Sequence, residues 1–226
     1  MRIDFAARFQ TVLARIRTAE HQFQRPPNSV HLLAVSKTHP ASAVAALAAA
    51  GQRDFGENYV QEALDKITEL AALGLEWHFI GPIQANKTRS IAEHFAWAHS
   101  VDRLKIAERL NAQRPDDLPP LNVCLEVNID REPGKHGIDE SELVGLAQAV
   151  AGLPRLRLRG LMAIPAPATD FAAQRQPFAR LRGWKERLNR EGLDTLSMGM
   201  SDDLEAAVAE GATLVRIGTA LFGPRA

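Results

Sequence analysis

Lys37 is the residue with the most distinctive potential chemistry. It follows an apolar run at residues 31–35, within the segment Ser36-Lys37-Thr38, and it carries a primary amine. Desolvation and a neighbouring cation both disfavour an ammonium group, so a lysine held in a closed site loses its proton more easily. The neutral amine can then attack an aldehyde to form a Schiff base. The alternative is a solvated lysine at the start of a loop, the commoner environment for this residue.

Two glycine-containing segments near the end of the chain have the composition of a phosphate site. They are residues 197–201 (SMGMS) and 216–219 (RIGT). Small residues let backbone N–H groups approach an anion, hydroxyl groups donate hydrogen bonds, and helix N-termini add positive dipoles. Gly199 or Gly218 alone would more often be a turn residue. Their joint occurrence favours a phosphate-binding site.

Arg216 and Lys37 are predicted to reach the same region. Alternation along residues 31–37 and 214–218 puts each cation on the same face of its run as large apolar side chains. A buried cation costs several kcal/mol unless it is paired. A bound phosphate ester, Glu57 or Glu126 would serve as the partner. The alternative for Arg216 is a purely structural ion pair.

Asp202 and Asp203 complicate the phosphate site because they directly follow Ser201. Their carboxylates would repel a phosphate if they faced it. We expect both to point into the first turn of the next helix, where negative charge stabilises the helix dipole.

The surrounding chain alternates short apolar runs with longer amphipathic ones. A helical spacing from Phe5 to Ile16 comes first and is stopped by Pro26 and Pro27. The expected strands are residues 31–35, 53–56, 76–80, 95–100, 121–128, 157–164, 195–198 and 213–217. The expected helices between them are residues 41–50, 59–73, 85–93, 103–113, 140–151, 171–191 and 203–210, with 220–222 closing the chain.

Eight strand-then-helix units predict a (β/α)8 TIM barrel with an additional N-terminal helix. The competing architecture is a doubly wound open sheet, which usually has a glycine-rich turn after its first strand. Here that turn reads SKTHP and contains no glycine. Because no linker or repeat interrupts the pattern, we expect residues 1–226 to form a single domain. In such a barrel the reactive groups lie at the C-terminal ends of the strands.

Composition excludes several classes of function. The chain has 27 basic and 27 acidic residues, so no net field attracts nucleic acid or an anionic membrane. The longest apolar run, residues 43–50, is far below the roughly 20 residues that span a bilayer. The lone Cys124 forms no internal disulfide, and the histidines show no paired metal spacing. We expect a cytoplasmic protein without a metal site.

Six segments together resemble the pyridoxal phosphate homeostasis protein family, single-domain barrels related to the N-terminal domain of alanine racemase. They are LLAVSKTHP (32–40), FGENYVQEA (55–63), WHFIGPIQANK (77–87), GLMAI (160–164), SMGMSDDLEAA (197–207) and VRIGTALFG (215–223). They cover almost the whole chain in order, and as a set they are highly specific. The cofactor implied by the resemblance is pyridoxal 5′-phosphate (PLP), which also unites an aldehyde with a phosphate.

The resemblance implies a role for each site residue. Lys37 would form the internal aldimine, and Arg216 would face the pyridine nitrogen. The phosphate would be bound by Ser201, Gly218 and Thr219. The residues lining the cofactor would be Asn58, His78 and Met162.

The charged segment 129–137 is similar to a loop of the same family. It keeps that pattern at Asn128, Glu132, Lys135 and Gly137, and departs from it at Pro133, Gly134 and His136. We expect a solvated loop that overhangs the mouth of the barrel. Control of ligand access is the alternative role.

A carrier role is favoured over catalysis. An arginine opposite the ring nitrogen keeps that nitrogen unprotonated, which weakens the ring as an electron sink. Alanine racemase also takes a second base from an additional β domain and a partner subunit, whereas this sequence ends at Ala226 after the barrel. We therefore expect a monomeric, non-enzymatic PLP carrier with PLP-dependent apo-enzymes as recipients. The alternatives are a minimal PLP-dependent amino-acid racemase and a Schiff-base aldolase.

Overall fold

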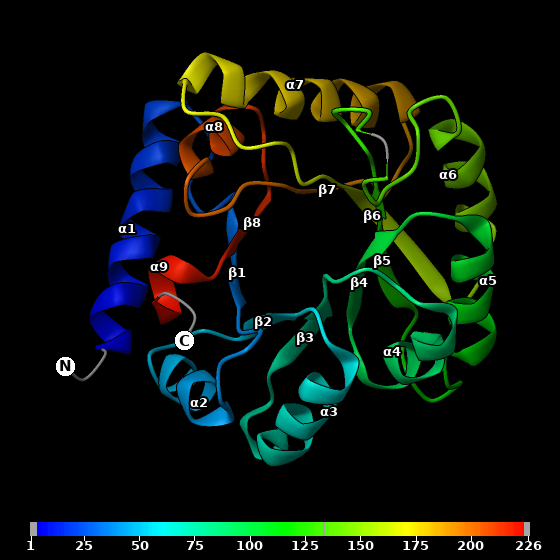
Figure 1. Ribbon diagram of the computed structural model, residues 1–226, viewed down its shortest axis with the longest axis horizontal. Coiled ribbons are helices and arrows are strands. Elements are labelled where there is room, and N and C mark those ends of the chain that lie inside the picture. Colours follow the sequence, from blue (N-terminus) through cyan, green and yellow to red (C-terminus); the bar gives the residue numbers. More distant parts are fainter. Residues whose placement is uncertain (1–3, 133, 224–226) are drawn as a thin grey trace.

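The strands form a closed parallel barrel in which each strand pairs with the next in sequence and β8 pairs with β1 (Figure 1). The computed structural model describes residues 4–132 and 134–223. The strands are β1 (His31–Val35), β2 (Asp54–Glu57), β3 (Glu76–Phe79), β4 (Trp97–Val101), β5 (Leu121–Glu126), β6 (Leu156–Met162), β7 (Thr195–Ser197) and β8 (Leu214–Ile217). The predicted TIM barrel is confirmed.

Helices surround the strands and follow them in alternation (Figure 1). The helices are α1 (Phe5–Gln22), α2 (Ala41–Ala49), α3 (Val60–Glu69), α4 (Thr88–His94), α5 (Leu104–Gln113), α6 (Leu143–Ala151), α7 (Phe171–Leu188), α8 (Leu204–Ala209) and α9 (Thr219–Phe222), with short 3-10 turns at Ala71–Leu73 and Ala85–Lys87. None of these helices has the length and apolar composition that crossing a bilayer requires.

Several boundaries differ from the predicted ones by one to four residues, and two of these differences have a clear local reason. The helix expected to reach residue 191 ends at Leu188, because Asn189 adopts the left-handed conformation at φ 38°. The strand expected to reach residue 128 ends at Glu126, where the chain leaves the barrel and only an isolated bridge joins Val127 to Ile138.

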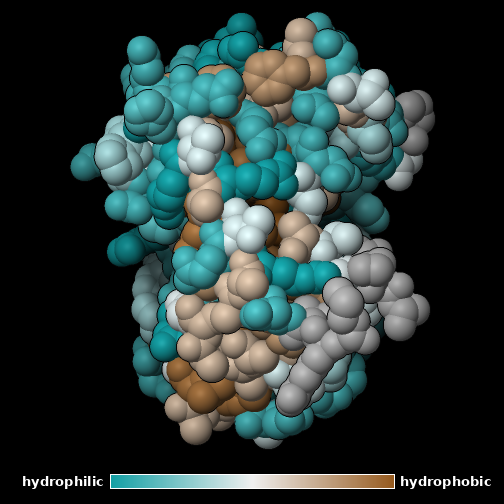
Figure 2. Space-filling model, turned by 90° about the vertical axis from the view of Figure 1, so that its left-hand side faces the viewer, coloured by the Kyte–Doolittle hydropathy of each residue, from teal (hydrophilic) through white to brown (hydrophobic). Residues whose placement is uncertain are grey.

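The additional N-terminal helix α1 is part of the main core. Phe9, Val12 and Ile16 recur at helical spacing and are buried, and Asp4 caps the helix by accepting a hydrogen bond from the Ala7 N–H at 3.0 Å. The helix packs against α2, α8 and α9. Figure 2 faces this side of the molecule: pale brown residues gather in its lower part, over the alanine-rich α2, and teal residues cover most of its upper part.

The barrel interior is separate from the core between strands and helices. Leu33, Val35, Ile80 and Leu214 form one interior apolar cluster. Trp97, Cys124 and Met162 form a second one. The predicted alternation along the first and last strands is therefore confirmed, and it leaves the next inward positions to the polar residues of the site.

Replacing Ile16 by alanine tests whether α1 is integral to the fold. Ile16 is fully buried in the core, so Ile16→Ala should lower the free energy of unfolding by about 2–5 kcal/mol. Urea unfolding followed by circular dichroism measures the difference. Val144→Ala is the control, since Val144 is 44% exposed on α6 and should change stability by less than about 0.5 kcal/mol. Equal effects of the two changes would contradict an integral α1.

Candidate functional site

A cavity of about 190 Å³ lies at the C-terminal ends of the strands. The predicted site residues that line it are Lys37, Asn58, Ser201, Arg216, Gly218 and Thr219. The other lining residues are Val35, His39, Ile80, Ile164, Met200, Asp202 and Gly223. Segments far apart in the sequence therefore meet at one mouth, as the barrel fold predicts.

The loop that carries Lys37 is held in place by helix α3. Thr38 adopts φ 67°, an uncommon backbone conformation for a β-branched residue, and its N–H donates to Glu62 Oε1 at 2.6 Å. Lys66 donates from Nζ to the carbonyl oxygen of Ser36 at 2.7 Å. Both neighbours of Lys37 are thus fixed to α3, which orients the lysine backbone at the cavity.

Glu57 does not face the cavity, which corrects the expectation that it could pair with Lys37 or Arg216. It is fully buried and lies 2.7 Å from Lys66 Nζ, while Ser36 Oγ donates to it at 2.6 Å. Burial raises the pKa of Glu57, and the hydrogen bonds from Lys66 and Ser36 oppose that effect. The reason is strand alternation: Gly56 occupies the inward position, where an added Cβ would meet the side chains of Ile80 and Leu33.

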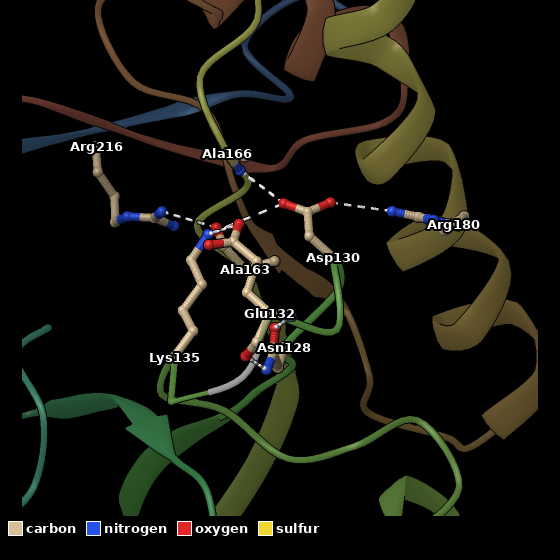
Figure 3. Close-up of polar contacts among 8 residues, drawn as sticks. All are labelled: Asn128, Asp130, Glu132, Lys135, Ala163, Ala166, Arg180 and Arg216. Carbon is tan, nitrogen blue, oxygen red and sulfur yellow. Dashed lines mark hydrogen bonds and ion pairs between the residues drawn. The ribbon is translucent and has the colours of Figure 1, made fainter.

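Arg216 lies inside the barrel with 4% of its surface exposed. Its Nη1 donates to the Ser197 carbonyl at 2.5 Å and to Ser197 Oγ at 2.9 Å, and Nη2 donates to the Ala163 carbonyl at 2.9 Å, the last drawn in Figure 3. Burial lowers the pKa of Arg216 to about 10, while Glu126 opposes this shift. The guanidinium therefore stays charged at neutral pH.

Among the charged groups that act on Arg216, the buried carboxyl group of Glu126 has the largest effect on its pKa. Burial raises the pKa of Glu126 to about 7, and the positive charge of Arg216 opposes the rise. The expectation that Glu126 is an electrostatic partner of Arg216 is consistent with this coupling. Glu126 exchanges between its neutral and charged forms near pH 7.

Asp202 and Asp203 do not both point into the first turn of α8 as expected. Asp203 Oδ1 accepts a hydrogen bond from the Met200 N–H at 2.6 Å, and burial raises the pKa of Asp203. Asp202 lines the cavity. The loop 198–203 folds back on itself before the helix starts at Leu204, so the two carboxylates separate.

The segments predicted to form an anion cradle, around Gly199 and Gly218, both reach the cavity through Ser201, Gly218 and Thr219. Gly199 has φ 94°, and an added Cβ would lie 2.5 Å from Ala207 Cβ, so only glycine fits there. Gly218 immediately precedes α9, whose first N–H groups have no acceptor within the helix. With the hydroxyl groups of Ser201 and Thr219, these N–H groups provide donors at one side of the cavity.

Asn58 shows that the cavity fits a polar ligand. Its Oδ1 is buried and has no hydrogen-bond partner within the described part of the chain. A buried acceptor without a donor is costly, so a ligand donor at this position would satisfy it. An amine, an anion cradle and a buried acceptor then suit a small phosphorylated aldehyde with further polar groups.

His78 and Met162 lie outside this cavity, although both were predicted to line it. Ile80, directly after β3, is the inward residue at the mouth, and His78 is two positions deeper in the barrel. Met162 is fully buried against Trp97 and Cys124. Contact of either side chain with a bound cofactor stays a prediction.

The cavity also has lining residues that the sequence analysis did not single out. Ile164 and Met200 follow β6 and β7, and His39 follows β1. The ring of His39 stacks on Phe222 with centroids 4.7 Å apart. Their positions just after strand ends were the available clue, since residues there reach the mouth of a barrel.

The charged loop after β5 is tied to the segment that follows the neighbouring strand β6 and to helix α7. Asp130 accepts from the Ala166 N–H at 2.6 Å and from Arg180 of α7 at 3.0 Å, and Lys135 Nζ lies 3.9 Å from it (Figure 3). The loop is therefore anchored at its acidic residue. Control of ligand access remains a prediction.

Residues that this loop shares with the family pattern stabilise its turn. The Glu132 N–H donates to Asn128 Oδ1 at 3.1 Å, and Asn128 Nδ2 donates to the Glu132 carbonyl at 2.9 Å. Gly137 has φ 109°, and an added Cβ would lie 2.6 Å from the Asn128 nitrogen. Glu132 and His136 are exposed, as predicted for a solvated loop, whereas Pro133 lies outside the described residues.

Comparison with known proteins gives matches over nearly the whole chain. The family model for the N-terminal domain of alanine racemase matches residues 9–226. A pyridoxal phosphate homeostasis protein of Pseudomonas aeruginosa is 67% identical over 214 residues, which cover 95% of this chain and 93% of that protein. PipY of Synechococcus elongatus PCC7942, solved with PLP bound, is 42% identical with a TM-score of 0.84, covering 97% of this chain and 100% of PipY.

Alanine racemase from Corynebacterium glutamicum matches in fold alone. It is 18% identical with a TM-score of 0.68, and the match covers 97% of this chain and 60% of the racemase. The additional helix and the barrel are thus compatible with the architecture shared by these proteins.

Glu126 should make stability depend on pH. Its pKa is raised to about 7 in the folded state, so the native protein holds this proton more tightly than the unfolded chain. The resulting stabilisation is complete below about pH 4.5 and is lost as the pH rises through about 7. The wild type should therefore lose on the order of 2 kcal/mol of unfolding free energy between pH 4.5 and pH 8 that Glu126→Gln does not lose.

Urea unfolding at the two pH values measures this difference. Glu132→Gln is the matched control, because Glu132 is exposed in the neighbouring loop. Parallel pH profiles for the wild type and Glu126→Gln would show that Glu126 does not titrate as proposed.

Proposed function

Because the chain belongs to the pyridoxal phosphate homeostasis protein family, whose barrel is that of the alanine racemase N-terminal domain, we propose that it carries PLP covalently on Lys37. The role is vitamin B6 homeostasis without substantial catalysis. The observation that carries this proposal is the meeting of Lys37, the partnerless acceptor of Asn58 and the 199–201 and 218–219 segments in one cavity.

Each lining residue has a task in holding the cofactor. Ser201, Gly218 and Thr219 would bind the phosphate through hydroxyl and backbone donors. Arg216 would face the pyridine nitrogen, and Asn58 would meet a polar group of the ring. When bound, PLP supplies an aldehyde carbon and an electron-withdrawing ring.

His78 and Met162 would then support the site from deeper layers of the barrel. The ring of His78 and the thioether of Met162 lie behind residues that line the cavity.

The charge of Arg216 supports a carrier over an enzyme. A guanidinium buried to this extent disfavours a second positive charge on a neighbouring ring nitrogen. A ring with an unprotonated nitrogen withdraws electrons less strongly, so bonds at a bound amino acid are less activated. Reversible exchange of the amine at the aldehyde carbon still allows PLP to be taken up and released.

A minimal racemase is the second candidate. It would need another acid–base group near the lysine. His39 and Asp202 line the cavity and would be the groups to supply it. A Schiff-base aldolase also uses a lysine and a phosphate site. The carrier proposal includes a monomeric protein in the cytoplasm, with PLP-dependent apo-enzymes as recipients of the cofactor.

Lys37→Ala should abolish covalent PLP binding. The purified wild-type protein incubated with PLP should show the visible absorption band of a Schiff base, and borohydride should fix one cofactor mass on the chain. The variant should show neither change, because no other lysine replaces the amine at this site. Lys87→Ala is the control, since Lys87 is exposed on another loop.

Peptide mapping after reduction would locate the modified residue. Modification at a lysine other than Lys37 would refute the proposal. A colourless protein that borohydride traps only with a sugar phosphate would favour the aldolase.

Turnover measurements separate a carrier from a racemase. The PLP-loaded protein should racemise alanine and other amino acids at rates far below the roughly 10 s⁻¹ of a typical enzyme. Chiral chromatography of the products gives the rate. A kcat near that value, lost in His39→Ala or Asp202→Asn, would establish the racemase instead.

A further inference from the structure

A second cavity lies at the opposite end of the barrel, at the N-terminal ends of the strands. Its lining residues are Ser29, His31, Leu32, Asp54, Glu76, His78, Trp97, Arg159, Asp194, Thr195, Thr213 and Leu214. None of these residues lines the Lys37 cavity. Within it, one oxygen each of Asp54 and Glu76 and one ring nitrogen of His78 lie within 4.8 Å of one another.

Strand register brings these three side chains together. On the paired strands β2 and β3, Asp54 lies opposite Glu76 and Gly56 lies opposite His78. Residues at alternate positions share a face, so Glu76 and His78 both point inward. The cluster is thus a consequence of the fold, although the two strands are separated by helix α3.

His78 directs an unsatisfied nitrogen at the two carboxylates. Its side chain is 3% exposed, and its Nε2 has no hydrogen-bond partner within the described residues. Nε2 lies 3.5 Å from Asp54 Oδ1 and 3.5 Å from Glu76 Oε1. The carboxylates are themselves accessible, with side chains 41% and 49% exposed. A buried ring nitrogen therefore faces a solvent-reachable acidic pair.

The charge of the cavity suits a divalent cation. Its formally charged lining residues are three carboxylates (Asp54, Glu76 and Asp194) and one guanidinium (Arg159). Arg159 is held by Asp194 at 2.7 Å, and the other two carboxylates face His78, which is charged only when protonated. A bound M²⁺ would neutralise them.

We propose that Asp54, Glu76 and His78 form a binding site for a divalent transition-metal ion such as Zn²⁺. One imidazole nitrogen with carboxylate oxygens is a donor set that zinc accepts, and water would complete the coordination. Ligands about 2.1 Å from a tetrahedral ion lie about 3.4 Å apart, close to the two separations measured from Nε2.

Neighbouring groups already orient two of these ligands. Trp97 Nε1 donates to Glu76 Oε1 at 2.8 Å, and the Trp97 ring stacks on His78 with an interplanar angle of 6°. His78 Nδ1 lies 3.0 Å from His99 Nε2, so a metal on Nε2 leaves the other nitrogen to donate to His99. Such outer hydrogen bonds are characteristic of metal-binding histidines.

Calorimetric titration of the full-length, tag-free protein with ZnCl₂ tests the site. The wild type should bind one Zn²⁺ per chain, and Asp54→Asn and Glu76→Gln should each weaken binding by at least about tenfold. Glu69→Gln is the matched control, because it removes one exposed carboxylate elsewhere and should leave the affinity unchanged. His99→Gln, which removes the imidazole that orients His78, should weaken Zn²⁺ binding by about 10- to 100-fold.

Co²⁺ provides a second measurement that does not depend on the buried histidine tolerating substitution. The visible spectrum of bound Co²⁺ should appear with the wild type and disappear with Asp54→Asn, whose circular dichroism and Schiff-base band with PLP should stay as in the wild type. Absence of Zn²⁺ binding, or affinity unchanged in both Asp54→Asn and Glu76→Gln, would overturn the proposal.

Discussion

The guanidinium of Arg216 is the charge around which the mouth of this barrel is built. A buried cation is stable only where hydrogen bonds and opposite charge replace its hydration. Here the carbonyls of Ala163 and Ser197, at the ends of neighbouring strands, accept its hydrogen bonds. Glu126 adds a carboxyl group whose charge varies near neutral pH. Strand ends, rather than loops alone, thus define the floor of the cavity.

A different buried ion pair positions the backbone next to Lys37. Glu57 and Lys66 lie on the outer side of β2, and Lys66 also holds the Ser36 carbonyl. Removal of either charge would leave the other buried and unpaired, a cost of several kcal/mol. The first cation, Arg216, therefore shapes the cavity from inside the barrel, while the second, Lys66, holds the backbone next to Lys37 from outside.

A line of polar side chains crosses the barrel between the two cavities. His78 Nδ1 lies 3.0 Å from His99 Nε2, His99 Nδ1 lies 2.8 Å from Ser197 Oγ, and Arg216 donates to the same hydroxyl at 2.9 Å. Burial holds the pKa of His99 well below its usual range, so its ring is neutral and each nitrogen has one role, donor or acceptor. The direction of the hydrogen bond between His78 and His99 therefore constrains the direction of the one between His99 and Ser197.

The sequence by itself determined the barrel and the additional helix. It also singled out Lys37, Arg216 and the glycine segments as candidate site residues, because periodicity and strand-end motifs are local properties. It did not determine how deep each inward side chain lies, and neither His78 nor Met162 is among the residues that line the cavity. Nor did it reveal that Glu57 faces outward, or that Asp54 meets Glu76 and His78. Those relations depend on the register between strands and on closure of the barrel, and both are set by packing between distant segments.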